Sequence, residues 1–220
     1  MHSIFLMKGR LVCHDLAGQY IFSAQIMQNC ATTEEIYMKR KNVTWVVALF
    51  ILFLYSRSAF SATYYVPDDF GSIQAAITAA TGGDEIIVRD GTYTGAGNKN
   101  IDFGGKAVTL RSENGPENCI LDCQNNGRAF YFHTGETSAS VVQGFTMTRG
   151  LPNVAPLHGG AVLCNNSSPS ISDCVLTDNA AGPDGAGGGI CCEYASPIIR
   201  NCVIDGNSAY YAGAILCRFN

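Results

Sequence analysis

Acidic side chains are the first candidates for chemistry in the C-terminal third of this chain. Five of them stand between residues 170 and 206: Asp173, Asp178, Asp184, Glu193 and Asp205. Hydrolysis of a glycosidic bond needs two carboxyl groups, one of which donates a proton. When the chain is compared with itself 28 residues on, Asp173 aligns with Asn201 and Asp178 with Gly206. We therefore expect turn or surface positions here, and no catalytic pair.

Histidine and arginine supply few alternatives. His158 precedes Gly159 and Gly160, so the sequence favours a histidine in a glycine-rich turn over a catalytic one. Arg200 and Arg218 are the basic residues of the last 60 positions. Arg218 aligns with Glu193 at an interval of 25, which predicts an ion pair between neighbouring strands.

Three tyrosines are candidate ligand-binding residues: Tyr194, Tyr210 and Tyr211. They fall in or near predicted turns, where an aromatic face beside polar groups suits stacking on a sugar ring. The alternative is ordinary packing within the turns. If the tyrosines bind a ligand, we expect a polysaccharide or a cell-surface glycan.

A repeat organises the segments that carry these residues. The letters GGAVLC at 159–164 return as GGGICC at 187–192 and as AGAILC at 212–217. A period of 20–50 residues is typical of a solenoid. The column through Cys202 has no further member after residue 220, which predicts a truncated stack with an open parallel edge at 215–219.

Two apolar columns extend the repeat toward the N-terminus. One joins Cys119, Phe145, Cys174 and Cys202, and the other joins Leu121, Met147, Leu176 and Ile204; both have intervals of 26, 29 and 28. In a parallel β-helix, each strand pairs with its copy about 4.8 Å above, so that like residues lie on like. An irregular β-sandwich would not produce such columns. We predict an all-β parallel β-helix, with Asn179 and Asn207 forming an amide ladder at one turn.

Cysteines form columns of their own. Cys164, Cys192 and Cys217 would stack in one column, and Cys174 and Cys202 in another. Stacked Cα atoms would lie within bridging range, but parallel Cβ vectors disfavour the dihedral angle that a disulfide needs. The sequence favours interior thiols, leaves disulfides open, and predicts no metal site or cofactor. Cys191 aligns with outward positions, so we expect an exposed thiol there.

One helix is predicted in the repeat-bearing part. Ser72 is a suitable N-cap, Ile73 and Ile77 share a face, and Gly82 and Gly83 follow, which predicts a helix over 72–80. Such a helix could cap the first rung. Short strands are expected at 63–67, 85–88, 101–103 and 107–110.

The N-terminal 61 residues have a different composition. Residues 38–61 are typical of a secretory signal: a basic start at 39–41, an apolar run over 43–55, and small residues before Ala62. A membrane anchor is the alternative, although the run is short for a span. Residues 1–37 are interpreted as a non-native or disordered extension, and 62–220 as the β-helix.

Charge excludes some partners. Residues 62–220 hold 8 Lys and Arg against 15 Asp and Glu. This acidic surface argues against nucleic acid, and mildly against an anionic polysaccharide.

The helix at 72–77 with Asp90-Gly91-Thr92-Tyr93 resembles the opening of pectin-lyase-like right-handed β-helix proteins, and the repeats are similar to those of polymorphic outer-membrane proteins. The resemblance covers roughly residues 63–220 and implies a right-handed β-helix. Leu176 and Ile204 stand where the outer-membrane repeats have Phe. The sequence favours an exported, non-catalytic, adhesin-like binding or structural module, secreted or on the outer surface. The alternative is a polysaccharide lyase, glycoside hydrolase or pectin esterase-like enzyme whose active rungs lie outside these residues.

Overall fold

The computed structural model describes residues 3–7, 10–14 and 61–218, which belong to two units, 1–58 and 59–220. In the first unit, β1 (Ser3–Met7) pairs antiparallel with β2 (Arg10–His14). The predicted signal segment lies outside the described residues except for Ser61. The signal segment, and the interpretation of residues 1–37 as a non-native or disordered extension, stay predictions. No helix among the described residues is long and apolar enough to cross a membrane.

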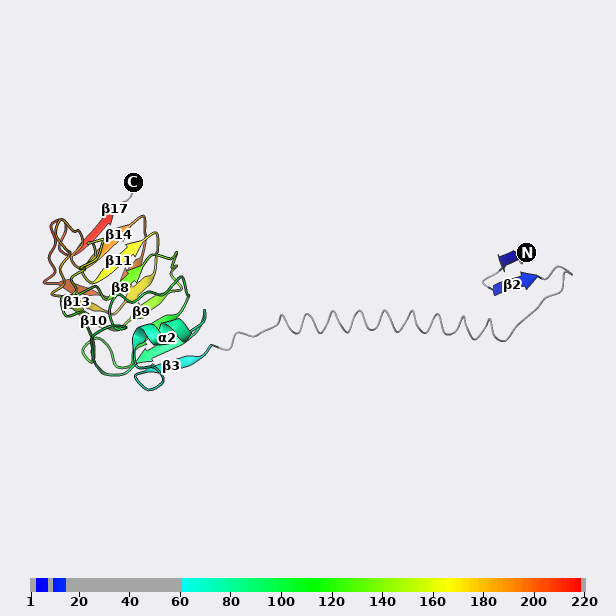
Figure 1. The fold of residues 1–220 in the computed structure, drawn as a ribbon, viewed down its shortest axis with the longest axis horizontal. Helices are drawn as coiled ribbons and strands as arrows, with labels where there is room; N and C mark the ends of the chain where they lie inside the picture. The colour runs from blue at the N-terminus through cyan, green and yellow to red at the C-terminus, as the bar shows by residue number, and fades with distance from the viewer. Residues whose placement is uncertain (1–2, 8–9, 15–60, 219–220) are drawn as a thin grey trace. The chain divides into compact units, whose positions relative to one another are not determined.

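Three parallel sheets build the second unit (Figure 1). The first sheet contains β3 (Thr63–Val66), β4 (Glu85–Val88), β6 (Thr109–Ser112), β9 (Val141–Gln143), β12 (Ser170–Ser172) and β15 (Ile198–Arg200). The second sheet contains β5 (Gly91–Tyr93), β7 (Cys119–Asp122), β10 (Thr146–Thr148), β13 (Val175–Thr177) and β16 (Val203–Asp205). The third sheet contains β8 (Phe130–Phe132), β11 (Val162–Asn165), β14 (Ile190–Glu193) and β17 (Ile215–Arg218). Successive strands of each sheet come from successive turns of the chain, which confirms the parallel β-helix. Its handedness stays a prediction.

Strand register confirms the apolar columns. Met147 lies opposite Leu121 on one side and Leu176 on the other, and Leu176 lies opposite Ile204. Leu121, Met147 and Leu176 are fully buried. Burial of one such side chain contributes about 1.5–3 kcal/mol, and no single rung could provide it alone.

The helix α2 (Ile73–Ala79) confirms the prediction at 72–80. The Ser72 hydroxyl accepts a hydrogen bond from the Ala75 N–H at 3.3 Å, so Ser72 is the N-cap. Ile73 and Ile77 are buried, and α2 packs against β3 and β4 at the N-terminal end of the unit (Figure 1). Its role as a cap for the stack stays a prediction.

Corners between sheets explain the recurring Gly, Asp and Asn. The corner between the first and second sheets holds Gly144, Asp173 and Asn201 on successive rungs, with φ of 78°, 54° and 51°. Left-handed backbone is open to Gly and is tolerated by Asp and Asn better than by other residues. Asp173 and Asn201 are therefore aligned because the corner requires this conformation.

Two local expectations were wrong. Residues 101–103 form no strand, and Ile101 makes only an isolated bridge to Phe130. Cys191 lies opposite Leu163 and Leu216 as expected, but it is fully buried. The reason is that Ala186, in the turn before β14, packs over Cys191 and Leu163 as a small second apolar cluster.

Candidate functional site

Side chains along a β-strand point alternately to its two faces, and in the first sheet this places a row of polar side chains on the outer face. Leu110 and Val142 point into the core, so the next residues, Arg111 and Gln143, point outward from neighbouring strands in direct register. Gln143 in turn lies opposite Ser172, and Asp173 follows at the corner. Three rungs thus contribute a guanidinium, an amide and a carboxylate to one surface.

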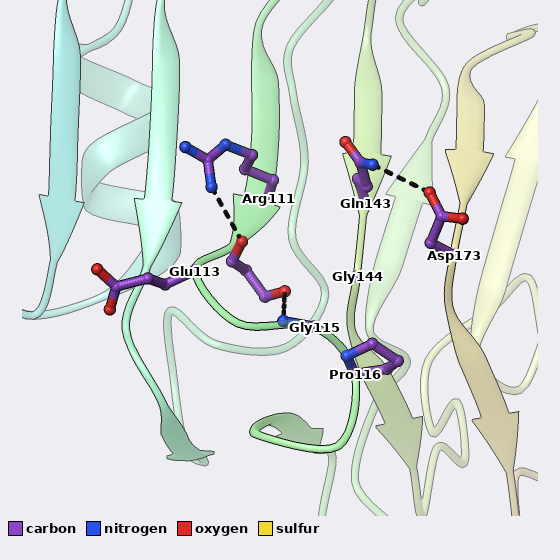
Figure 2. A pocket seen from close by; sticks show the side chains of 8 residues that line it. Arg111, Glu113, Gly115, Pro116, Gln143, Gly144 and Asp173 are labelled. Carbon is purple, nitrogen blue, oxygen red and sulfur yellow. Dashed lines mark hydrogen bonds between the residues drawn. The ribbon is translucent and has the colours of Figure 1, made fainter.

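These side chains line a groove of about 230 Å³ (Figure 2). The lining residues are Arg111, Ser112, Glu113, Gly115, Pro116, Gln143, Gly144 and Asp173. Gly144 helps to keep the groove open, because a Cβ atom there would lie 2.5 Å from the Ser112 hydroxyl oxygen. The Ser112 hydroxyl in turn accepts a hydrogen bond from the Gly115 N–H at 3.0 Å, which fixes the curve of the loop at the groove floor.

Hydrogen bonds hold Asp173 in its ionised form. Gln143 Nε2 donates to Asp173 Oδ2 at 3.0 Å (Figure 2), and Asn201 Nδ2 donates to Asp173 Oδ1 at 3.1 Å. These bonds, the one from Asn201 first, lower the pKa of the Asp173 carboxyl group. A proton donor needs the opposite shift, so Asp173 is suited to accepting hydrogen bonds rather than to acid catalysis.

Ion pairs neutralise the other charges of the groove. Arg111 Nε donates to Glu85 Oε1 at 2.7 Å, and Glu113 forms an ion pair with Arg89. Arg111 retains further N–H donors, and the Gln143 amide oxygen remains as an acceptor. Apart from the Asp173 carboxylate, the groove therefore presents donors and acceptors whose charges are already paired, a combination that suits a ligand rich in hydroxyl groups.

The predicted ligand-binding tyrosines lie outside this groove. Tyr194, Tyr210 and Tyr211 are 52%, 69% and 59% exposed. The rings of Tyr210 and Tyr211 meet edge to face with centroids 4.6 Å apart, and Tyr211 makes a bridge to Ala186. Tyr194 follows β14 in a left-handed turn. Their role in binding stays a prediction.

The third sheet brings His158 and Glu193 together. The expected ion pair between Glu193 and Arg218 forms, with Glu193 buried. His158 Nε2 lies 3.8 Å from Glu193 Oε1, while His158 Nδ1 accepts a hydrogen bond from the Ala186 N–H at 3.1 Å. One ring nitrogen thus contacts the turn before β14 and the other lies near β14 itself, which agrees with a structural role for His158.

Asparagine and cysteine columns lie on neighbouring rungs as expected. Asn179 Nδ2 donates to Asn207 Oδ1 at 2.9 Å. Cys192 lies opposite Cys164 and Cys217 in register, and Cys174 and Cys202 precede the paired residues Val175 and Val203. The eight cysteines of residues 61–218 are free thiols, but Cys217, which was expected in the interior, is exposed on the last described rung. Within residues 61–218, no group of three or more His, Cys, Asp or Glu side chains could hold a metal ion.

Of the remaining acidic candidates, Asp178, Asp184 and Asp205 are exposed at turns or at a strand end, apart from the groove. Sequence reasoning identified Asp173 but missed its neighbours, because Arg111 and Gln143 are 32 residues apart and fall outside the clear repeat. No protein-family model, curated protein or solved structure matches this chain significantly.

Proposed function

We propose that this protein is an exported, non-catalytic β-helix module that binds a neutral oligosaccharide in the groove of its first sheet. The observation that carries the proposal is the row of Arg111, Gln143 and Asp173 on three successive rungs. Sugar hydroxyls donate and accept at the same atom, and these three side chains together offer both functions. A rigid, repetitive backbone also presents them at a nearly constant spacing of about 4.8 Å.

Charge supports a neutral ligand over a uronate polymer. Residues 62–220 hold 15 acidic and 8 basic side chains, and Arg111 is already paired with Glu85. An anionic chain would meet the Asp173 carboxylate without a free cation to offset it. Export rests on the signal predicted at 38–61, and right-handed coiling rests on the resemblance to pectin-lyase-like proteins.

A carbohydrate-active enzyme is the second candidate. It is favoured by the presence of an acid, an amide and a guanidinium in one groove, since pectin esterase-like chemistry would use Asp, Gln and Arg on successive rungs. Against it stand the lowered pKa of Asp173 and the ion pair that holds Glu113. Both leave the groove without a carboxyl group poised to give up a proton at neutral pH.

Isothermal titration with a panel of neutral and uronate oligosaccharides tests the proposal. We expect saturable binding of a neutral member, with loss of affinity of about tenfold or more in Gln143→Ala, because the bound sugar would lose a hydrogen-bonding partner. The matched control is Ser138→Ala, an exposed residue outside the groove. Equal binding by both variants, or no binding by any member of the panel, would contradict the proposal.

A further inference from the structure

Cys174 and Cys202 stand at the same position of neighbouring rungs, where the first sheet turns into the second. Val175 pairs with Val203 directly after them, and the Val203 N–H donates to the Cys174 carbonyl oxygen at 2.9 Å. Neighbouring strands are about 4.8 Å apart, within the Cα separation of about 4.4–6.8 Å that a disulfide spans. The two side chains lie close enough for each to affect the ionisation of the other.

The two thiols differ in access. Cys174 is 1% exposed, whereas Cys202 is only partly buried. Cys202 directly precedes β16, which pairs with β13 alone among the described strands. A small molecule can therefore reach the partly buried Cys202. A disulfide would draw the two Cβ atoms to roughly 3.8 Å and turn them away from the parallel direction that stacking favours.

Their hydrogen bonds also differ with protonation. As thiols, Cys174 donates to the Ser172 carbonyl oxygen at 3.1 Å and Cys202 to the Arg200 carbonyl oxygen at 3.2 Å. When Cys202 loses its proton, the Cys174 thiol can turn and donate to the thiolate. This contact lowers the pKa of Cys202 to about 7, although burial and the Asp173 carboxylate oppose it. The same contact and burial raise the pKa of Cys174.

The other thiols of residues 61–218 lack this combination of access and acidity. The pKa of Cys192 is also lowered, first by its contact with Cys164, but Cys192 is fully buried. Burial raises the pKa of Cys119, Cys123 and Cys191 to about 12. Cys217 is exposed, but its pKa is raised, first by desolvation and then by its neighbour Cys192. If exposure alone decided reactivity, Cys217 would react first. If a lowered thiol pKa is also needed, Cys202 reacts first, so the site of reaction distinguishes the two explanations.

We propose that the Cys174–Cys202 pair is a modification site for low-molecular-weight disulfides. The Cys202 thiolate attacks one sulfur of the external disulfide, forms a mixed disulfide, and releases the other half as a thiolate that takes up a proton. Cys174 then loses its proton and attacks the Cys202 sulfur, forming the Cys174–Cys202 disulfide and releasing the second half as a thiol. The protein loses two hydrogens in total, and the external disulfide is reduced to two thiols. The product fastens the strand β16 covalently to the rung below.

Oxidised glutathione is the probe for a test on the full, reduced chain. Samples are quenched with acid over time, and the modified cysteines are mapped by peptide mass spectrometry. We expect a glutathione adduct on Cys202 first, followed by a peptide pair joined through Cys174 and Cys202. The Cys174→Ser variant should accumulate the adduct, and the Cys217→Ser control should behave as the unaltered chain does.

Alkylation of the unaltered chain by iodoacetamide gives a second readout that needs no variant. The rate at Cys202 should be half-maximal near pH 7, while the rate at Cys217 should still rise above pH 9. In urea, both rates should follow the ordinary pKa of cysteine, about 8.5. Faster adduct formation at Cys217 than at Cys202 in the folded chain, or an adduct at Cys202 that Cys174 never displaces, would overturn the proposal.

Discussion

Replacement of Asn179 by alanine tests how the rungs are held together at one corner. The Asn179 side chain is 1% exposed. Its Oδ1 atom accepts a hydrogen bond from the Gly150 N–H at 2.8 Å, and its Nδ2 atom donates to the Met147 carbonyl oxygen at 2.9 Å on the rung below. Its Nδ2 atom also donates to Asn207 on the rung above. One amide therefore joins three rungs.

The expected loss of stability follows from the backbone groups that have no hydrogen-bond partner in Asn179→Ala. The Gly150 N–H and the Met147 carbonyl group would lose a partner in a place that water cannot easily reach, at about 1–3 kcal/mol each. We expect Asn179→Ala to lower the free energy of unfolding by about 2–6 kcal/mol. With a urea m-value of about 2 kcal/mol/M, the midpoint falls by about 1–3 M.

The comparison variant is Asn207→Ala, which removes the outer member of the same ladder. Asn207 donates to the carbonyl oxygens of Leu176 and Asp205 and accepts hydrogen bonds from Asn179, but it is only partly buried. Water can replace its bonds, so we expect a loss of about 1 kcal/mol. Urea unfolding followed by circular dichroism measures both variants. If the two variants lose equal stability, or if Asn179→Ala loses less than Asn207→Ala, the buried ladder is not what joins these rungs.

Three further predictions concern the close packing, the core and the groove. Gly188→Ala should destabilise the chain by about 1–3 kcal/mol in urea unfolding, because a Cβ atom there would lie 2.3 Å from the Ser208 carbonyl oxygen; an unchanged midpoint would argue against this close approach of rungs. Leu176→Ala should cost about 2–5 kcal/mol and the half-exposed Thr177→Ala less than 1 kcal/mol, and a reversed order would show that the second sheet has the opposite face inward. The pKa of Asp173 should lie below its usual value of about 3.9, so its contribution to stability is present above about pH 4 and lost as the pH falls through the lowered pKa. Carboxyl chemical shifts followed by NMR against pH measure this pKa, and a pKa of Asp173 above its usual value would contradict the prediction.

The fold could be predicted because stacked rungs need similar residues at equivalent positions, and such residues recur at regular intervals in the sequence. Leu121, Met147 and Leu176 occupy the same position on successive rungs, so their spacing records the length of each turn of the chain. The aligned Asp173 and Asn201 record the left-handed corner. In each case a local physical requirement recurs once per rung, and recurrence is visible without coordinates.

The groove and the burial of Cys191 could not be predicted in this way. Arg111 and Gln143 are in register, but they are 32 residues apart, which is longer than the intervals of 26–29 in the apolar columns, so the repeat does not reveal their pairing. Cys191 alternates outward as expected, yet Ala186 from a preceding turn covers it. Loops that fold back over a sheet depend on contacts between residues with no repeated spacing, and such contacts leave little trace in a single sequence.

Oligosaccharide binding with product analysis on the same samples tests the central proposal most directly. The full chain is incubated with neutral and uronate oligosaccharides while reducing ends and unsaturated uronate are measured, and binding is followed by NMR at Arg111, Gln143 and Asp173. We predict saturable shifts at these three residues with a neutral oligosaccharide and no release of product. Release of reducing ends or unsaturated uronate would contradict a non-catalytic module, and shifts confined to Tyr210 and Tyr211 would place the binding site elsewhere.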